Sequence, residues 1–212
     1  SSRRPTLRQN PIHVILARPR ANLCHPEGMK DSLIKLPFGA IACLILALFA
    51  FYPALSHAGL PQGADMEVHY WRTFELDRIW QSGELIPRWG MDFHYGYGAP
   101  VFQFTAWGFY GLASLAGKLP GVDDVLRIKL IWFLGIYLAA YGTYRFVSRR
   151  WGTTAGLVSA ASFIFAPAFI FGEPIGRGAP PVTLAMGFFA MSLALLDIYA
   201  ENKRPTTAIL AA

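Results

Sequence analysis

The segment from Gly63 to Arg72 reads Gly-Ala-Asp-Met-Glu-Val-His-Tyr-Trp-Arg, so two carboxylates, an imidazole and a guanidinium fall within eight positions. It follows the stretch from Leu36 to Ser56, which has 21 residues and no charge. Such a stretch is long enough to cross a bilayer core of about 30 Å. Acid, base and cation beside a membrane can move a proton and neutralise a phosphate. The segment is therefore a candidate site for chemistry on a substrate that arrives in the membrane.

Helical spacing places most of these groups on one side. We expect a helix over residues 65–82 that ends at Gly83. Four side chains then fall within an arc about 60° wide: Asp65, His69, Arg72 and Leu76. Glu67 lies on the opposite side of the helix. It would join Asp65 only if residues 65–67 were extended, because side chains two positions apart then point the same way.

Each of these residues also has an ordinary structural explanation. Asp65 is a typical N-cap, and Glu67 is favoured by the positive end of the helix dipole. His69 can be a plain interface residue, and Arg72 can pair with a nearby carboxylate or meet a lipid phosphate. Capping, however, needs only one short polar residue. The combination of four ionisable groups therefore favours a site.

A turn-rich aromatic stretch follows at residues 85–100 and supplies further candidates for substrate binding. Arg88 is its cation, while Tyr95 and Tyr97 flank Gly96, a residue that permits backbone conformations closed to others. The tyrosines can form a platform for a sugar ring or a lipid headgroup, or they can anchor the loop in the interface. Both explanations remain open at this stage.

Composition indicates an integral membrane protein. Hydrophobic residues make up 54% of the chain and charged residues only 15%, against about 25% charged residues in an ordinary soluble domain. The net charge of +6 does not indicate nucleic acid, because the arginines are scattered among prolines and aromatics and do not gather on one face. Cys24 and Cys43 are the only cysteines and form no disulfide framework.

We expect an all-α fold with about four transmembrane helices. The predicted spans are residues 36–56, 128–146, 153–171 and 182–200. Lys30 and Lys35 place the N-terminus in the cytoplasm, because basic residues concentrate on that side. The apolar stretch 99–117 is rich in aromatics and glycine, and we place it in the outer interface, since this also keeps Arg149 and Arg150 inside.

On this topology, residues 57–127 form an extracytoplasmic loop with two interfacial helices. The pair Glu173 and Arg177 lies in the other extracytoplasmic loop, where it can contribute to substrate binding or form a plain solvated ion pair. Residues 1–28 are expected to be a disordered tail or upstream read-through before a natural start at Met29. Residues 205–212 resemble the opening of another apolar helix, so we expect the natural protein to continue.

Several parts of the sequence together resemble one family: Asp65-Met66-Glu67, residues 71–78, Pro87-Arg88-Trp89 and Gly96-Tyr97-Gly98-Ala99-Pro100. They are similar to bacterial polytopic proteins described as 6-pyruvoyl-tetrahydropterin synthase-related membrane proteins, which in turn resemble GT-C-type glycosyltransferases. The resemblance covers about residues 38–204. It does not imply pterin chemistry, because we see no soluble domain and no zinc-ligand set for it.

The resemblance implies an enzyme of the bacterial inner membrane that transfers a sugar from a polyprenyl-phosphate donor to an extracytoplasmic acceptor. Asp65 takes the place of the family's loop acid and Glu67 that of its companion, as catalytic residues or as ligands of a divalent ion such as Mg²⁺ or Mn²⁺. Arg72 and Arg88 would hold the donor phosphate, which suits a planar guanidinium. The competing hypothesis is a non-catalytic membrane component of polysaccharide or lipid assembly. A coupled transporter is less favoured, because the predicted spans contain almost no ionisable residue.

Overall fold

A computed structural model describes residues 32–202 and 209, and everything below concerns these residues. The chain divides into two units, residues 1–35 and residues 36–212, and the packing described below is that of the second. The predictions for residues 1–28 and for a start at Met29 lie outside the described residues. The prediction that the chain opens a further helix after residue 205 lies almost wholly outside them too.

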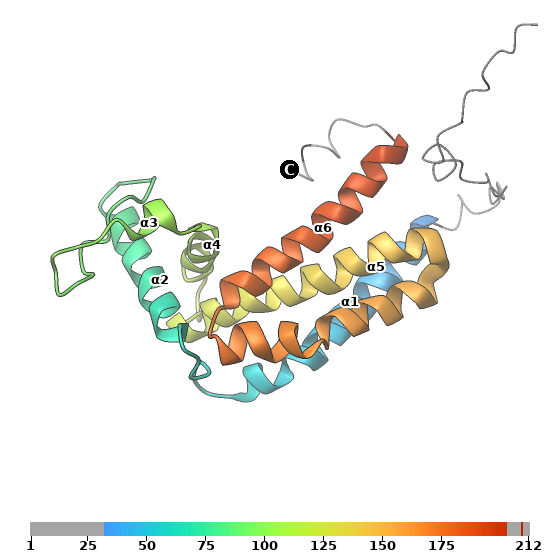
Figure 1. Cartoon of the computed structure of the whole chain (residues 1–212), viewed down its shortest axis with the longest axis horizontal. Helices are drawn as coiled ribbons and strands as arrows, with labels where there is room; N and C mark the ends of the chain where they lie inside the picture. The colour runs from blue at the N-terminus through green and yellow to red at the C-terminus, as the bar shows by residue number, and fades with distance from the viewer. Residues whose placement is uncertain (1–31, 203–208, 210–212) are drawn as a thin grey trace, which may run out of the picture. The chain divides into compact units, whose positions relative to one another are not determined.

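The described part of the chain is helical, which confirms the predicted all-α class (Figure 1). The elements in chain order are α1 (Ser32–Ser56), α2 (Met66–Gln81), α3 (Val101–Phe104), α4 (Gly108–Ala116), α5 (Asp124–Ile164), the π-helix η3 (Ala168–Gly176) and α6 (Pro180–Asn202). The extended pairing within this part of the chain is limited to an isolated antiparallel bridge between Gly90 and Ala99.

Among the described residues, three helical segments are long and apolar enough to cross a membrane: Phe38–Ser56, Asp124–Gly176 and Pro180–Glu201. This finding confirms the prediction of a multi-pass membrane protein. Large apolar side chains on the outer face of α1, such as Ile45 and Phe49, are exposed, as expected for contact with lipid tails. The middle segment has 53 residues, more than twice the roughly 20 that one crossing needs.

The middle segment reverses direction at Gly152. Its backbone has φ 85° and ψ 171°, a conformation that is readily accessible only to glycine. Figure 1 shows the yellow and orange arms of α5 running side by side in opposite directions. The arms touch closely, because a Cβ atom on Gly156 would lie 2.8 Å from the Cβ atom of Ser148. The predicted span 128–146 lies on the first arm, and the predicted span 153–171 covers the second arm and continues into η3.

α1 and the two arms of α5 share one apolar core. Cys43, Ala47 and Phe51 are spaced four residues apart on α1 and are buried against both arms of α5. Phe51 packs edge-on against Trp132 of the first arm, with ring centres 5.0 Å apart. A Cβ atom on Gly39 would collide with the ring of Tyr144. The start of α1 therefore meets Tyr144 and its end meets Trp132, so α1 runs antiparallel to that arm. The residues spaced four apart on α1 thus form the face that packs on α5.

α6 packs along the first arm of α5 through small residues. A Cβ atom on Gly135 would lie 2.7 Å from the Cα atom of Leu184, and one on Gly142 would lie 2.5 Å from the backbone nitrogen of Met191. Glycine allows this approach because helix backbones can meet only where no side chain separates them. Gly135 meets Leu184 and the later Gly142 meets the later Met191, so α6 runs parallel to the first arm.

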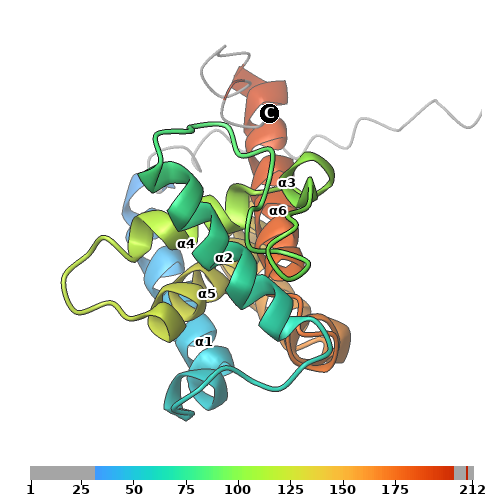
Figure 2. The same ribbon diagram turned by 90° about the vertical axis from the view of Figure 1, so that its left-hand side faces the viewer.

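The loop between α1 and α5 has short helices. Its helix α2 closely matches the predicted helix 65–82, and Gly83 after it has a positive φ of 92°. The apolar stretch 99–117 is broken into α3 and α4, which have 4 and 9 residues. Neither is long enough to cross a bilayer, as expected for a stretch that does not span. Figure 2 shows α2 in front of α4 and α5.

Gly135→Ala tests the close contact between α5 and α6. We expect the free energy of unfolding to fall by about 1–3 kcal/mol, because the added methyl group meets the backbone of Leu184 and not a flexible side chain. Thermal melting of the purified protein in detergent measures it. Gly108→Ala is the matched control, since a Cβ atom there meets nothing within 4 Å. Equal melting temperatures for the two variants would contradict this packing.

Candidate functional site

The start of α2 is covered by the segment that links η3 to α6. The backbone N–H of Asp65 donates to the carbonyl oxygen of Arg177 at 2.9 Å. A Cβ atom on Gly63 would lie 2.4 Å from the Cα atom of Gly178, so the two glycines are in direct backbone contact. Two loops that are far apart in the sequence therefore meet at Asp65.

Two residues of α2 converge on one tyrosine of α4. The Nδ1 atom of His69 lies 2.8 Å from the hydroxyl oxygen of Tyr110, and an Nη atom of Arg72 lies 3.3 Å from the same oxygen. His69 and Tyr110 are buried, and Arg72 is partly buried. His69 and Arg72 therefore lie on one face of α2, as their spacing predicts, and both point toward α4.

The donors and acceptors of Arg72, Tyr110 and His69 determine the direction of the hydrogen bonds between them. Arginine has only donors, so the Tyr110 oxygen must accept from Arg72. Its own proton is then free to be donated to Nδ1 of a neutral His69, whose proton sits on Nε2. The arrangement holds the Arg72 guanidinium in place without neutralising its charge.

Burial lowers the pKa of His69 to about 4, and the positive charges of Arg72 and Arg177 act in the same direction. The negative charge of Asp65 opposes them. All three charged groups therefore lie near enough to act on the imidazole. Burial also raises the pKa of Tyr110, while its hydrogen bond from Arg72 opposes that rise. At neutral pH the imidazole and the phenol are uncharged.

Asp65 occupies the N-cap position of α2, but its side chain makes no capping hydrogen bond within the described residues. Asp65 is exposed, and its backbone contacts that of Arg177. Capping by the side chain therefore does not explain why an acid stands here. The free carboxylate can take a proton from a bound molecule.

Glu67 lies apart from Asp65. The helix begins at Met66, so residues 65–67 are not extended and the two carboxylates face different sides. One oxygen of Glu67 accepts from the indole N–H of Trp71 at 3.3 Å, on the exposed side of α2. In the described part of the chain, no three His, Cys, Asp or Glu side chains gather in a way that could hold a metal ion. Asp65 and Glu67 thus do not form a ligand pair, and the proposed Mg²⁺ or Mn²⁺ site stays an untested prediction.

Glu173 and Arg177 form an ion pair of 3.0 Å at the end of η3. The Arg177 side chain remains 61% exposed, so its guanidinium is accessible to a bound molecule. The structure brings this pair to the start of α2, because the backbone of Arg177 and Gly178 packs on Asp65, and the charge of Arg177 acts on the His69 imidazole.

The aromatic loop is placed elsewhere. It packs on the second half of α2, where the side chain of Arg78 contacts Asp92 and the backbone N–H of Asp92 donates to Glu75. Three predicted substrate-binding residues of this loop are exposed: Arg88, Tyr95 and Tyr97. Glu75 lies about 15 Å along the helix axis from Asp65 at 1.5 Å per residue. The contacts of this loop therefore do not bring it to the Asp65 cluster.

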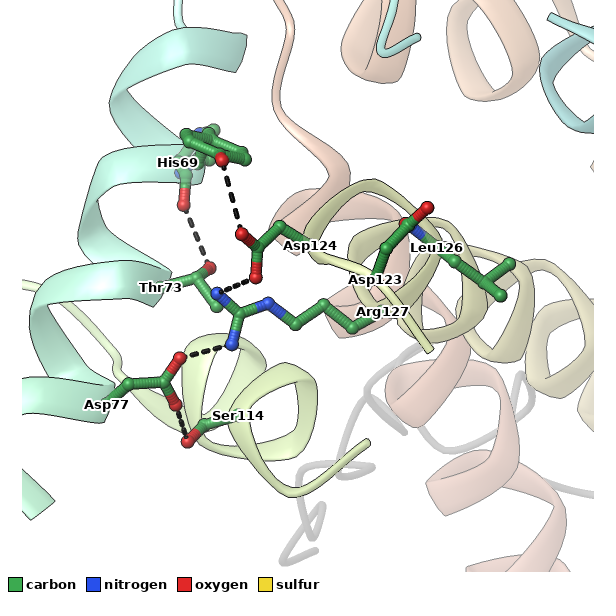
Figure 3. Close-up of polar contacts among 9 residues, drawn as sticks. His69, Thr73, Asp77, Ser114, Asp123, Asp124, Leu126 and Arg127 are labelled. Carbon is green, nitrogen blue, oxygen red and sulfur yellow. Dashed lines mark hydrogen bonds and ion pairs between the residues drawn. The ribbon is translucent and has the colours of Figure 1, made fainter. Parts of the chain in front are cut away.

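A buried ion-pair network positions α2, and sequence analysis missed it. Arg127 near the start of α5 contacts Asp77 of α2 and lies 2.8 Å from Asp124, while Ser114 of α4 donates to the other oxygen of Asp77 (Figure 3). The Arg127 side chain is only 6% exposed. A signal existed in the sequence, because His69, Thr73 and Asp77 recur every four residues on one face.

Lowering the pH should destabilise the protein through His69. The folded state keeps the imidazole neutral down to about pH 4, whereas an unfolded histidine takes up a proton below its ordinary value of 6.5. The stability that is present above pH 6.5 is therefore lost between these two values, by up to about 3 kcal/mol. The glutamine of the His69→Gln variant does not titrate, so this variant should lose less stability over the same pH range.

Thermal melting between about pH 7 and about pH 4.5 measures this difference. The control is His94→Gln, which removes an exposed histidine and should behave like the parent. If the parent and His69→Gln lose stability equally over this range, His69 is not held neutral by its surroundings.

Nothing matches this chain in comparisons with models of protein families, with curated proteins or with solved structures. The resemblance to GT-C-type membrane proteins therefore stays a prediction. A functional assignment depends on the geometry around Asp65, His69 and Arg72.

Proposed function

We propose that this protein is a membrane glycosyltransferase of the GT-C type that uses a polyprenyl-phosphate-linked sugar, with Asp65 as general base. The observation that carries the proposal is the docking of Arg177 and Gly178 on the start of α2. It gathers one accessible carboxylate and two guanidinium groups around a buried histidine and tyrosine. A base and a phosphate-binding group on neighbouring positions are what this transfer needs.

Four membrane crossings put this site on one side. The first arm of α5 runs antiparallel to α1, the second arm runs antiparallel to the first, and α6 runs parallel to the first arm. The loop before α5 and the loop before α6 then lie at the same end of these helices. With the N-terminus in the cytoplasm, as the basic residues near it favour, that end is extracytoplasmic.

The reaction exchanges one bond at the anomeric carbon of the sugar. The acceptor hydroxyl oxygen forms a bond to that carbon, its proton passes to the Asp65 carboxylate, and the bond from carbon to the phosphate oxygen breaks. Polyprenyl phosphate leaves with the bonding electron pair. Its growing negative charge is the feature that nearby cations stabilise most.

Arg72 is suited to the leaving phosphate. Within the described residues it forms no ion pair, and its buried Nε atom has no hydrogen-bond partner. Arg177, on the segment that packs against the start of α2, adds an accessible second guanidinium. His69 and Tyr110 act as positioning residues, because they hold Arg72 while adding no charge. A guanidinium that lacks a carboxylate partner favours binding an anion.

Cysteine labelling tests the four crossings. In a background with Cys24 and Cys43 replaced by serine and alanine, we expect Leu119→Cys to react with an impermeant thiol reagent added to intact cells. Trp151→Cys should react only after the cells are opened, since residues 119 and 151 then lie on opposite sides. Both positions are exposed, so poor access does not explain a difference. Equal labelling in intact cells would contradict the four-span topology.

Substitution of Asp65 tests the chemistry. Because its side chain makes no capping bond, Asp65→Asn and Asp65→Ala should both melt like the parent. Turnover should fall about 10²-fold or more in both, the scale of losing a general base. Release of polyprenyl phosphate from a set of polyprenyl-phosphate hexoses measures turnover whatever the acceptor. Glu84→Gln, an exposed carboxylate beyond α2, is the matched control.

The same assay separates catalysis from binding. A parental rate for Asp65→Asn would refute the role of Asp65. Binding of polyprenyl phosphate that Arg72→Gln weakens, with no turnover in the parent, would instead favour a non-catalytic component of polysaccharide or lipid assembly.

A further inference from the structure

An apolar cleft of about 480 Å³ lies between α4 and the first turns of α6. Its walls are entirely carbon-rich side chains and glycines. They include Trp80, Trp107, Leu112, Pro181, Ala185 and Phe188. A volume of this size lies within the usual range for small-molecule sites, and such a lining suits a hydrocarbon chain.

A smaller polar cleft of about 210 Å³ adjoins it and shares the wall made by Trp80. Lys118, Ser114, Asp77 and Arg127 line this second cleft. Asp77 and Arg127 neutralise each other in a buried ion pair. Lys118 is the remaining charge of the polar cleft.

Lys118 has an aromatic neighbour but no ion-pair partner among the described residues, since the Asp77 carboxylate that shares its cleft pairs with Arg127. Its ammonium lies 5.8 Å from the centre of the Trp80 ring, and none of the ion pairs in this part of the chain includes it. The apolar cleft, a tryptophan wall and a cation with no carboxylate partner therefore follow one another. This order matches a molecule with a hydrocarbon chain and a negative headgroup.

We infer that these two clefts bind one membrane phospholipid with a net negative headgroup, its acyl chain between α4 and α6 and its phosphate at Lys118. The polar end of the site is distinct from the Asp65 cluster, because Trp80 in its wall lies about 22 Å along α2 from Asp65 at 1.5 Å per residue. The inference does not depend on the proposed sugar transfer. A bound lipid would join the short helix α4 to the membrane helix α6.

Native mass spectrometry of the purified protein with phosphatidylglycerol and phosphatidylcholine in equal amounts tests this. We expect the anionic lipid to be retained about fivefold more than the zwitterionic one, the effect of one lysine near a phosphate. Lys118→Gln should abolish that preference, and Lys118→Arg should keep it. Equal retention of both lipids by the parent would overturn the inference.

Ala185→Phe tests the place of the acyl chain. Ala185 is exposed in the cleft, so a phenyl ring there fills the space without entering the core, and retention of both lipids should fall. Leu196→Phe is the control, since residue 196 is exposed on the same helix outside the cleft. Circular dichroism and gel filtration verify that each variant is folded.

Three outcomes of this second test would overturn the inference. The first is retention of phosphatidylglycerol that Ala185→Phe leaves unchanged. The second is a dimer in place of lipid adducts, which would assign the cleft to a second copy of the chain. The third is polyprenyl phosphate displacing phosphatidylglycerol from the parent but not from Ala185→Phe, which would make the cleft part of the donor site.

Discussion

The backbone contact between the start of α2 and the segment before α6 is the constraint on which the candidate site depends. Gly63 and Gly178 meet without intervening side chains, and the N–H of Asp65 donates to Arg177 across the same contact. A side chain at either glycine would push the two loops apart. Arg177 would then no longer lie beside Asp65 and His69, and the cluster would lose one of its cations.

That contact holds only one end of α2, and the buried ion pair holds the other. Arg127 is tied to Asp77 of α2, and Asp77 also accepts from Ser114 of α4. A buried arginine without its carboxylate is strongly unfavourable, so these three elements keep one arrangement. α4 in turn carries Tyr110, which holds Arg72. The geometry of the candidate site therefore depends on residues that take no part in the proposed chemistry.

The membrane helices provide the framework for both contacts. Gly152 lets α5 return beside itself, and Gly135 lets α6 approach the first arm. These two features bring the loop before α5 and the loop before α6 to the same end of the helices. Residues 57–123 and 177–179 can then meet although they are separated by both arms of α5.

The sequence by itself determined the helical class, the apolar segments and the face of α2 that carries His69 and Arg72, because each follows from a local period of hydrophobicity or charge. It also indicated that residues 99–117 do not form a transmembrane helix. Only the tertiary structure decided which groups meet. Tyr110 belongs to the aromatic stretch 99–117 that the sequence places in the interface, and its contact with His69 joins residues 41 positions apart. The pairing of Arg127 with Asp77, and the packing of the aromatic loop on the second half of α2, arise from contacts between distant segments, which no local pattern records.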